Sequence, residues 1–198
     1  MTNDLIERYV AVEGIPADIA RRFRTAECLV DRADIDFAVD QLAVKMTAHL
    51  QDANPLIVPV MQGGLVFAGM LMRRLAFPLR QDYVHVGRYA QTSGGDLVRH
   101  HHGPADFDGQ TVVLVDDILD EGRTLEDLVA WAAGRGAERV LTAVLVTKEN
   151  PRRNPATVAD FSALECGPLF VIGCGLDYEG YGRNLPDIYA LQDGEATP

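Results

Sequence analysis

Three aspartates follow a short apolar run in the middle of the chain, at a spacing that could hold a polar ligand. Residues 112–115 are apolar without a polar break, which predicts a strand buried on both faces of a parallel sheet. Asp116 and Asp117 come directly after this run, and Asp120 follows two apolar residues later. Because open α/β sheets bind ligands at the carboxyl ends of their strands, we expect the three carboxylates to face a ligand.

The segment after the third aspartate predicts a phosphate site. It consists of Glu121, Gly122, Arg123 and Thr124, and it opens a helical pattern at residues 122–135. Backbone N–H groups at a helix N-terminus, beside a glycine and a Thr hydroxyl, favour an anion. Acids that accept from hydroxyls, next to such a site, suit a sugar phosphate. An acid pair alone would equally suit a receiver domain or a magnesium site.

A second strand end carries a pair of glycines. An apolar run at residues 56–61 is followed by Gln62, Gly63 and Gly64, and a helical pattern covers residues 65–75. Glycines let the backbone approach a bound anion closely. Since a glycine pair after a strand is often an ordinary turn, this loop alone does not decide between a turn and a binding site.

Apolar runs alternate with amphipathic periods along the chain, and they predict the elements that position these residues. Helices are expected at residues 35–50, with Asp34 as the N-cap, and in an N-terminal stretch that presents Leu5, Ile6 and Tyr9. Further strands are expected at residues 27–30, 82–88, 98–102, 138–147, 155–161, 169–174 and near 188. This alternation indicates an α/β fold with a mostly parallel central sheet.

Composition and charge disfavour several classes of protein. The 198 residues are enough for one domain, expected to span residues 1–198. A formal net charge of −11 argues against a nucleic-acid partner. Three cysteines without CxxC spacing make a disulfide framework or a zinc site unexpected. No apolar run could span a bilayer, and the acidic N-terminus lacks a signal-peptide core, so a cytoplasmic protein is expected.

The segment at residues 112–124 resembles the phosphoribosyl pyrophosphate (PRPP) signature of type I phosphoribosyltransferases. Four apolar residues, two acids, two apolar residues and the pattern D-x-G-x-T occur in order. The resemblance implies the type I phosphoribosyltransferase fold, a mostly parallel central sheet flanked by helices. It also implies a core at residues 30–165, a hood subdomain from the N-terminal segment and residues 166–191, and a mobile hairpin loop.

Two loops carry further parts of the resemblance. The loop at Gln62 is similar to the pyrophosphate loop of purine phosphoribosyltransferases, which often has Lys at this position and a cis peptide bond before the glycines. Met61–Gln62 is therefore a candidate cis bond. The polar stretch at residues 89–96 resembles the mobile loop, which usually begins with Ser-Tyr, whereas this chain has Arg88, Tyr89 and, further on, Ser93. A flexible surface hairpin would have the same composition, so the loop's contacts stay open.

Residues 169–185 resemble the base-binding end of hypoxanthine-guanine phosphoribosyltransferases. An aromatic residue, a GxxLDY core and an Arg-x-Leu pattern match in order. The resemblance implies transfer of the 5-phosphoribosyl group from PRPP to hypoxanthine or guanine, with xanthine as a third candidate, giving IMP or GMP and pyrophosphate. It also implies Mg²⁺ as the cofactor and a homodimer or homotetramer. The sequence does not rank the three bases.

The resemblance assigns roles to residues that hold the sugar and the phosphates. Asp116 and Asp117 would accept hydrogen bonds from the ribose hydroxyls, and Asp120 would exchange a proton with N7 of the purine. The segment from Glu121 to Thr124 would bind the 5′-phosphate. Arg183 would bind pyrophosphate together with the loop of Gln62, Gly63 and Gly64.

It also assigns the residues that recognise the base. Lys148 would donate to O6, and Phe170 would stack on the purine ring with Ile118 on the other face. The carbonyl of Val171 would accept from the 2-amino group of guanine. Asp177, together with Asp117, would hold Mg²⁺, an ion that keeps several waters and needs few protein carboxylates.

Two other functions are compatible with parts of the pattern. A PRPP-sensing regulator of the same fold would bind RNA or DNA, which the net charge of −11 disfavours. A transferase for adenine or a pyrimidine is disfavoured by Lys148, because the amino group of adenine is itself a donor.

Overall fold

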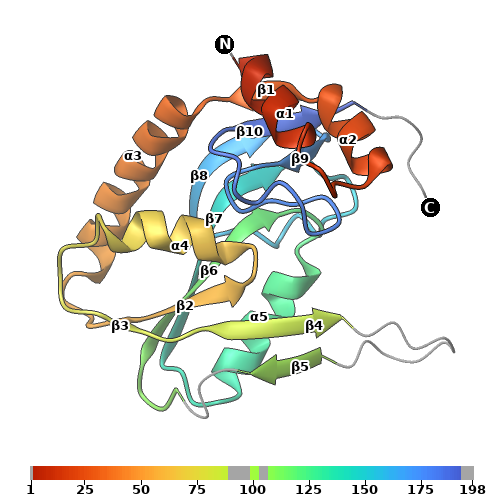
Figure 1. Cartoon of the computed structure of the whole chain (residues 1–198). Helices are drawn as coiled ribbons and strands as arrows, with labels where there is room; N and C mark the ends of the chain where they lie inside the picture. Colours follow the sequence, from red (N-terminus) through yellow and green to blue (C-terminus); the bar gives the residue numbers. More distant parts are fainter. Residues whose placement is uncertain (1, 89–98, 103–106, 193–198) are drawn as a thin grey trace, which may run out of the picture.

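A sheet of seven strands forms the centre of the molecule (Figure 1). The computed structural model describes residues 2–88, 99–102 and 107–192. The strands run in the order β5-β4-β2-β6-β7-β8, with β3 beside β2, and neighbours are parallel except in the β4–β5 hairpin. Their bounds are β2 Leu56–Met61, β3 Arg80–Gln81, β4 Val84–Arg88, β5 Arg99–His102, β6 Thr111–Leu119, β7 Arg139–Lys148 and β8 Phe161–Cys166.

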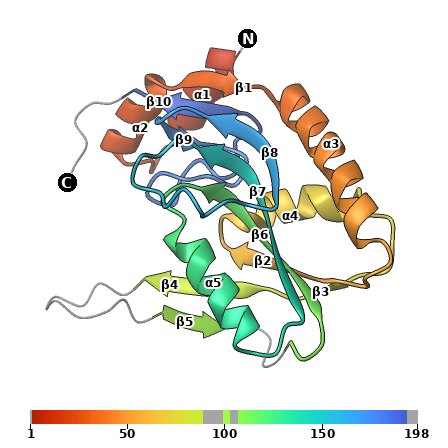
Figure 2. The same ribbon diagram turned by 180° about the vertical axis from the view of Figure 1, so that it is seen from behind.

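Helices cover both faces of this sheet, because successive side chains of a strand point to opposite faces. On one face, α3 (Arg32–Leu50) and α4 (Gly64–Met72) pack against a core that includes Val113. On the other, α5 (Arg123–Ala133) packs against a core that includes Leu114, as the view from behind shows (Figure 2). The predicted α/β fold with a mostly parallel sheet is confirmed.

A smaller antiparallel sheet lies beside the central one and is built from both ends of the described chain. It has the order β1-β10-β9 and is covered by two short helices (Figure 1). The fully buried Phe23 and Tyr189 belong to the core between these helices and the small sheet. The bounds are α1 Thr2–Val10, α2 Ala17–Arg24, β1 Glu27–Val30, β9 Phe170–Ile172 and β10 Ile188–Leu191.

The central strand β6 is longer than the sequence predicted. It continues through Asp116 and Asp117 to Leu119, because β7 pairs alongside it as far as Leu119 opposite Thr147. The prediction that the two acids follow the strand was therefore wrong. They lie in its last part and are positioned by the sheet itself.

Two boundary predictions were also wrong. The N-cap of α3 is Asp31, whose carboxylate accepts from the backbone N–H of Asp34 at 2.9 Å, so Asp34 lies in the first turn. The strand expected at residues 155–161 instead begins at Phe161. The Asp160 carboxylate accepts from the backbone N–H and the hydroxyl of Thr142 on β7, each at 2.8 Å. Just before Phe161, this side chain therefore takes the place of backbone hydrogen bonds between the two strands.

None of the helices in the described part of the chain is long and apolar enough to cross a membrane. The chain's three cysteines, Cys28, Cys166 and Cys174, are free thiols.

Candidate active site

The end of β6 and the start of α5 enclose the largest part of the site. A cavity of about 440 Å³ is lined by the unbroken stretch from Asp116 to Leu125. Asp120 and Thr124 therefore face the same cavity, as the predicted sugar-phosphate site requires.

A smaller cavity of about 130 Å³ adjoins the first and gathers the residues that the resemblance assigned to the base. Asp117, Ile118 and Asp120 line both cavities. The other lining residues come from the ends of β7 and β9 and from the loop after β9, namely Lys148, Phe170, Val171, Leu176 and Asp177. Segments far apart in the sequence thus meet at one edge of the central sheet.

Burial raises the proton affinity of the two adjacent aspartates. The pKa of Asp116 lies well above its usual value of 3.8, chiefly because of burial and then because of the neighbouring charge of Asp117. Burial also raises the pKa of Asp117, against the opposing effects of a hydrogen bond with Asp116 and the charge of Arg183. The backbone N–H of Asp117 donates to Asp116 Oδ1 at 2.9 Å. The pair is therefore costly to ionise without a ligand that donates hydrogen bonds.

This cost predicts a pH-dependent stability. When folding raises the pKa of a carboxyl group, the protein loses stability as the pH rises from the pKa of the unfolded state through the pKa of the folded state. Asp116→Asn should remove the loss while still accepting from the N–H of Asp117. We expect the variant to exceed the wild type in free energy of unfolding at neutral pH, by about 1.4 kcal/mol for each unit by which the folded pKa is raised.

Urea denaturation between about pH 4 and pH 8 measures this difference. Asp52→Asn, at an exposed site, is the matched control and should leave the pH profile unchanged. An Asp116→Asn profile parallel to that of the wild type would contradict the account.

Arg183 lies between two carboxylates of the site. Its Nη2 lies 2.5 Å from Asp177 Oδ1, its Nη1 lies 3.6 Å from Asp117 Oδ2, and Nη1 also donates to the carbonyl of Gly175 at 2.6 Å. Its buried Nε has no partner among the described residues. The guanidinium therefore joins the end of β6 to the loop after β9.

The glycine loop after β2 packs directly on β6. A Cβ at Gly63 would lie 2.0 Å from Asp117 Oδ2, and a Cβ at Gly64 would lie 2.3 Å from the carbonyl oxygen of Val115. A Cβ at Gly175 would lie 2.7 Å from the carbonyl oxygen of Gly63. The lack of side chains at these three glycines therefore allows, in the first place, close packing between segments of the protein itself. The Met61–Gln62 peptide bond is cis, as the resemblance implied, and Gln62 is exposed.

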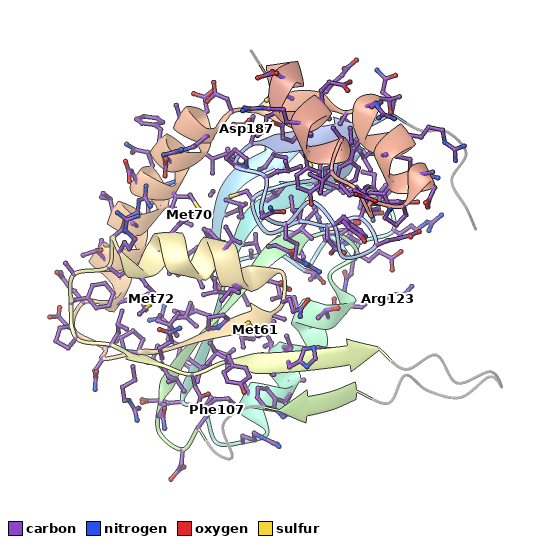
Figure 3. All side chains as sticks on the ribbon, in the orientation of Figure 1. Met61, Met70, Met72, Phe107, Arg123 and Asp187 are labelled. Atoms are coloured by element: carbon purple, nitrogen blue, oxygen red, sulfur yellow. The ribbon has the colours of Figure 1, made fainter. Side chains whose placement is uncertain are left out.

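The segment from Glu121 to Thr124 has the geometry of a loop that ends in a helix N-terminus. Gly122 has φ +83°, and a Cβ there would lie 2.7 Å from Thr157 Cγ2, so a side chain at this position would be strained and crowded. α5 begins at the next residue, so the segment leads into a helix N-terminus, whose dipole favours an anion. Arg123 pairs with Glu121 at 3.4 Å and points away from the sheet (Figure 3).

The carboxylate of Asp120 is held from both sides. Lys148 Nζ donates to its Oδ2 at 3.1 Å, and Asn150 Nδ2 donates to its Oδ1 at 2.5 Å. Arg153 Nη1 donates to the carbonyls of Leu119, Asp120 and Lys148 at 3.1, 3.3 and 2.7 Å. Neither Asn150 nor Arg153 was among the site residues predicted from the sequence. Their position just after the strand that ends in Lys148 was the only available signal.

The smaller cavity, named the base cavity for the role that the resemblance implies, has a half-exposed aromatic wall. Phe170 is 44% exposed, and the Tyr178 ring meets it edge-on with centroids 5.6 Å apart. Ile118 and Val171 line the same cavity. Of the residues expected in the mobile loop, Arg88 ends β4, whereas Tyr89 and Ser93 lie outside the described residues. β5 pairs with β4 in antiparallel orientation, so the expected pairing of these two strands is confirmed.

Comparison with known proteins defines the class. A family model described as phosphoribosyl transferase domain matches residues 27–179, and the chain belongs to the phosphoribosyltransferase family. Over 166 residues, the chain is 31% identical to the hypoxanthine-guanine phosphoribosyltransferase of Bacillus subtilis (strain 168), covering 83% of this chain and 92% of that one. Over 175 residues, it is 29% identical to the enzyme of the same name from Aquifex aeolicus (strain VF5), covering 87% and 98%.

Comparison with a solved structure supports the same family. The chain superposes on a hypoxanthine phosphoribosyltransferase from Staphylococcus aureus with a TM-score of 0.75 at 26% identity, covering 84% of this chain and 92% of that one. The observed sheet and its flanking helices thus have the type I phosphoribosyltransferase fold.

Proposed function

We propose that this protein transfers the 5-phosphoribosyl group from PRPP to a 6-oxopurine, giving the nucleoside monophosphate and pyrophosphate. Hypoxanthine and guanine are the expected acceptors, with xanthine as a third. One observation carries the proposal. The cavity that suits a sugar phosphate and the cavity that suits a planar base share Asp117, Ile118 and Asp120, so the two substrates would meet at these residues.

The chemistry follows from this placement. The bond from C1 of the ribose to pyrophosphate breaks, its electron pair leaves with pyrophosphate, and positive charge develops on the ring. Asp116 and Asp117 accept hydrogen bonds from the ribose hydroxyls, and their negative charge stabilises that cation. N9 of the purine bonds to C1 while the proton on N7 passes to Asp120, which acts as general base.

Base recognition depends on Lys148. Its ammonium group lies in the base cavity, 3.1 Å from Asp120, where an O6 acceptor can replace part of that contact. Adenine presents an amino donor at the same position and leaves the cation without this acceptor. Because the ammonium group keeps its bond to Asp120, the loss is that of one hydrogen bond from a charged group, about 1.5–3 kcal/mol. Phe170 supplies the stacking face.

A panel of bases tests the proposal. With PRPP and Mg²⁺, release of pyrophosphate should be at least about 10²-fold faster, as kcat/KM, for hypoxanthine, guanine or xanthine than for adenine. Lys148→Met should lower kcat/KM for the oxopurines, because the O6 contact is lost. The ratio of kcat/KM between the oxopurines and adenine should therefore fall.

Equal kcat/KM for adenine and the oxopurines in the wild type would contradict the role of Lys148. An absence of pyrophosphate release with every base would contradict the proposed reaction as a whole. Lys45→Met, on the exposed side of α3, is the matched control and should change neither result.

The residues present fit Mg²⁺. Asp117 and Asp177 already direct carboxylate oxygens at one cation, the guanidinium of Arg183. Mg²⁺ is usually held by one or two carboxylates, water and substrate phosphates, so a larger protein cage is unnecessary. The ion would neutralise charge on the pyrophosphate oxygens. These two aspartates would hold it, and Arg183 with the Gly63–Gly64 loop would bind the leaving pyrophosphate.

Assembly and location are further parts of the proposal. A homodimer or homotetramer would bury exposed apolar side chains on α3 and α4, such as Phe37, Val44 and Leu65, which are 64%, 68% and 55% exposed. Free thiols at all three cysteines suit a reducing, cytoplasmic environment. Light scattering after size-exclusion chromatography tests the assembly, and a mass of one chain would contradict it.

A further inference from the structure

Two short helices at the N-terminus reach the site from outside the region that the family model matches. α1 and α2 precede residue 27, where that match begins. They pack on the small sheet through a core that includes Ile6, Ile19 and Phe23 (Figure 1). One side chain from each helix extends beyond this core to a different part of the site.

Tyr9 of α1 holds the loop that carries Arg183. Its hydroxyl accepts from the backbone N–H of Gly182 at 3.0 Å and donates to Asn184 Oδ1 at 3.2 Å. These two residues are the immediate neighbours of Arg183, so a single hydroxyl fixes the chain on both sides of it. The Tyr9 ring in turn stacks on Phe23 of α2, with centroids 5.8 Å apart.

The loop is closely fitted to this support. Gly182 has φ +93°, and a Cβ there would lie 3.2 Å from Phe23 Cζ. With its backbone fixed in this way, Arg183 directs its guanidinium at Asp177 and at the carbonyl of Gly175. A shift of the loop would move the guanidinium away from the carboxylates.

Arg22 of α2 holds the other end of the site. Its guanidinium carbon lies 4.9 Å from the centroid of the Tyr178 ring, a cation–π geometry. The Tyr178 ring meets Phe170 edge-on, with an interplanar angle of 82°. Arg22 therefore supports the aromatic wall of the base cavity through Tyr178, without touching the cavity itself.

We propose that the α1–α2 pair is a positioning element with two separate effects on substrate binding. Tyr9 is a positioning residue for Arg183 and so for PRPP and pyrophosphate. Arg22 is a positioning residue for Phe170 and so for the base. This inference rests on the proposed function, because it uses the roles assigned there to Arg183 and Phe170.

Steady-state kinetics of the full chain with PRPP, hypoxanthine and Mg²⁺ test the inference. Tyr9→Phe keeps the ring but loses both hydrogen bonds, so KM for PRPP should rise about fivefold while KM for hypoxanthine stays within about twofold. Arg22→Gln should give the opposite pattern, with KM for hypoxanthine raised about threefold and KM for PRPP unchanged. A merely structural role would not divide the two constants between the two variants.

The matched controls are Arg21→Gln, an exposed neighbour on α2, and Tyr83→Phe, a tyrosine that is 50% exposed. Both should match the wild type. Calorimetric titration of Mg²⁺–pyrophosphate gives a second readout, in which Tyr9→Phe binds more weakly and Arg22→Gln binds as the wild type does. If the wild type is active, the inference is overturned when both variants change KM for the same substrate, or when neither variant changes KM for PRPP or for hypoxanthine. Failure of the wild type to release pyrophosphate would instead reject the proposed function.

Discussion

Asp120→Asn is expected to lower kcat about 10²-fold or more while PRPP still binds, because an amide cannot take the proton from N7. The carboxylate accepts from Lys148 on one oxygen and from Asn150 on the other. In the variant, one of these donors faces an amide NH₂ group instead. Binding of PRPP should change little, since the ribose hydroxyls are assigned to Asp116 and Asp117.

Single-turnover kinetics with saturating PRPP and hypoxanthine measure the chemical step directly. Asp120→Glu retains a proton acceptor on a longer side chain, so it should recover part of the rate that Asp120→Asn loses. An asparagine variant that keeps a rate within about threefold of the wild type would remove Asp120 from the general-base role.

Gly64→Ala should weaken both the fold and the binding of PRPP. The added Cβ would lie 2.3 Å from the carbonyl oxygen of Val115, a backbone atom in the central strand that has little room to move. The loop and the start of α4 must therefore shift away from β6. Overpacking of this kind costs about 1–3 kcal/mol in stability, and we expect affinity for PRPP to fall at least about tenfold because the loop no longer meets Asp117.

Gly69→Ala is the matched control on the same helix. A Cβ at Gly69 meets nothing within 4 Å, so the substitution should stabilise the protein by about 0.5–1 kcal/mol through helix propensity alone. Thermal denaturation and titration with PRPP compare the two variants. Similar effects of both substitutions would show that helix propensity, and not contact with Val115, decides the outcome at Gly64.

Those parts of the site that are contiguous in the sequence could be predicted from it. The order of apolar strand, acid pair, third acid and glycine is local, and it determines which residues line the larger cavity. The resemblance also assigned Lys148 and Asp120 to the same base, and each lies at the end of a parallel strand, where such ends meet at one edge. Their direct contact was not predicted. The extension of β6 through Asp116 and Asp117 could not be predicted, because it depends on how far β7 pairs alongside β6.

Contacts between distant segments could not be predicted from the sequence. Asn150 and Arg153 occupy what reads as a turn, and only the folded chain brings them to Asp120 and its neighbouring carbonyls. Tyr9 is more remote still, 173 residues from the N–H group that it accepts. Its ring fits an amphipathic helix in the sequence, and nothing local reveals that its hydroxyl has partners near the other end of the chain.

The ion pair between Lys148 and Asp120 has a consequence for redesign of this enzyme. The group that would select the base and the group that would activate it are bonded to each other at 3.1 Å. Any substitution of Lys148 chosen to admit a new base also removes the donor that holds Asp120 Oδ2, and so alters how the carboxylate is positioned. Substrate range and turnover should therefore change together, and an engineered variant with altered preference will need a compensating donor near Asp120.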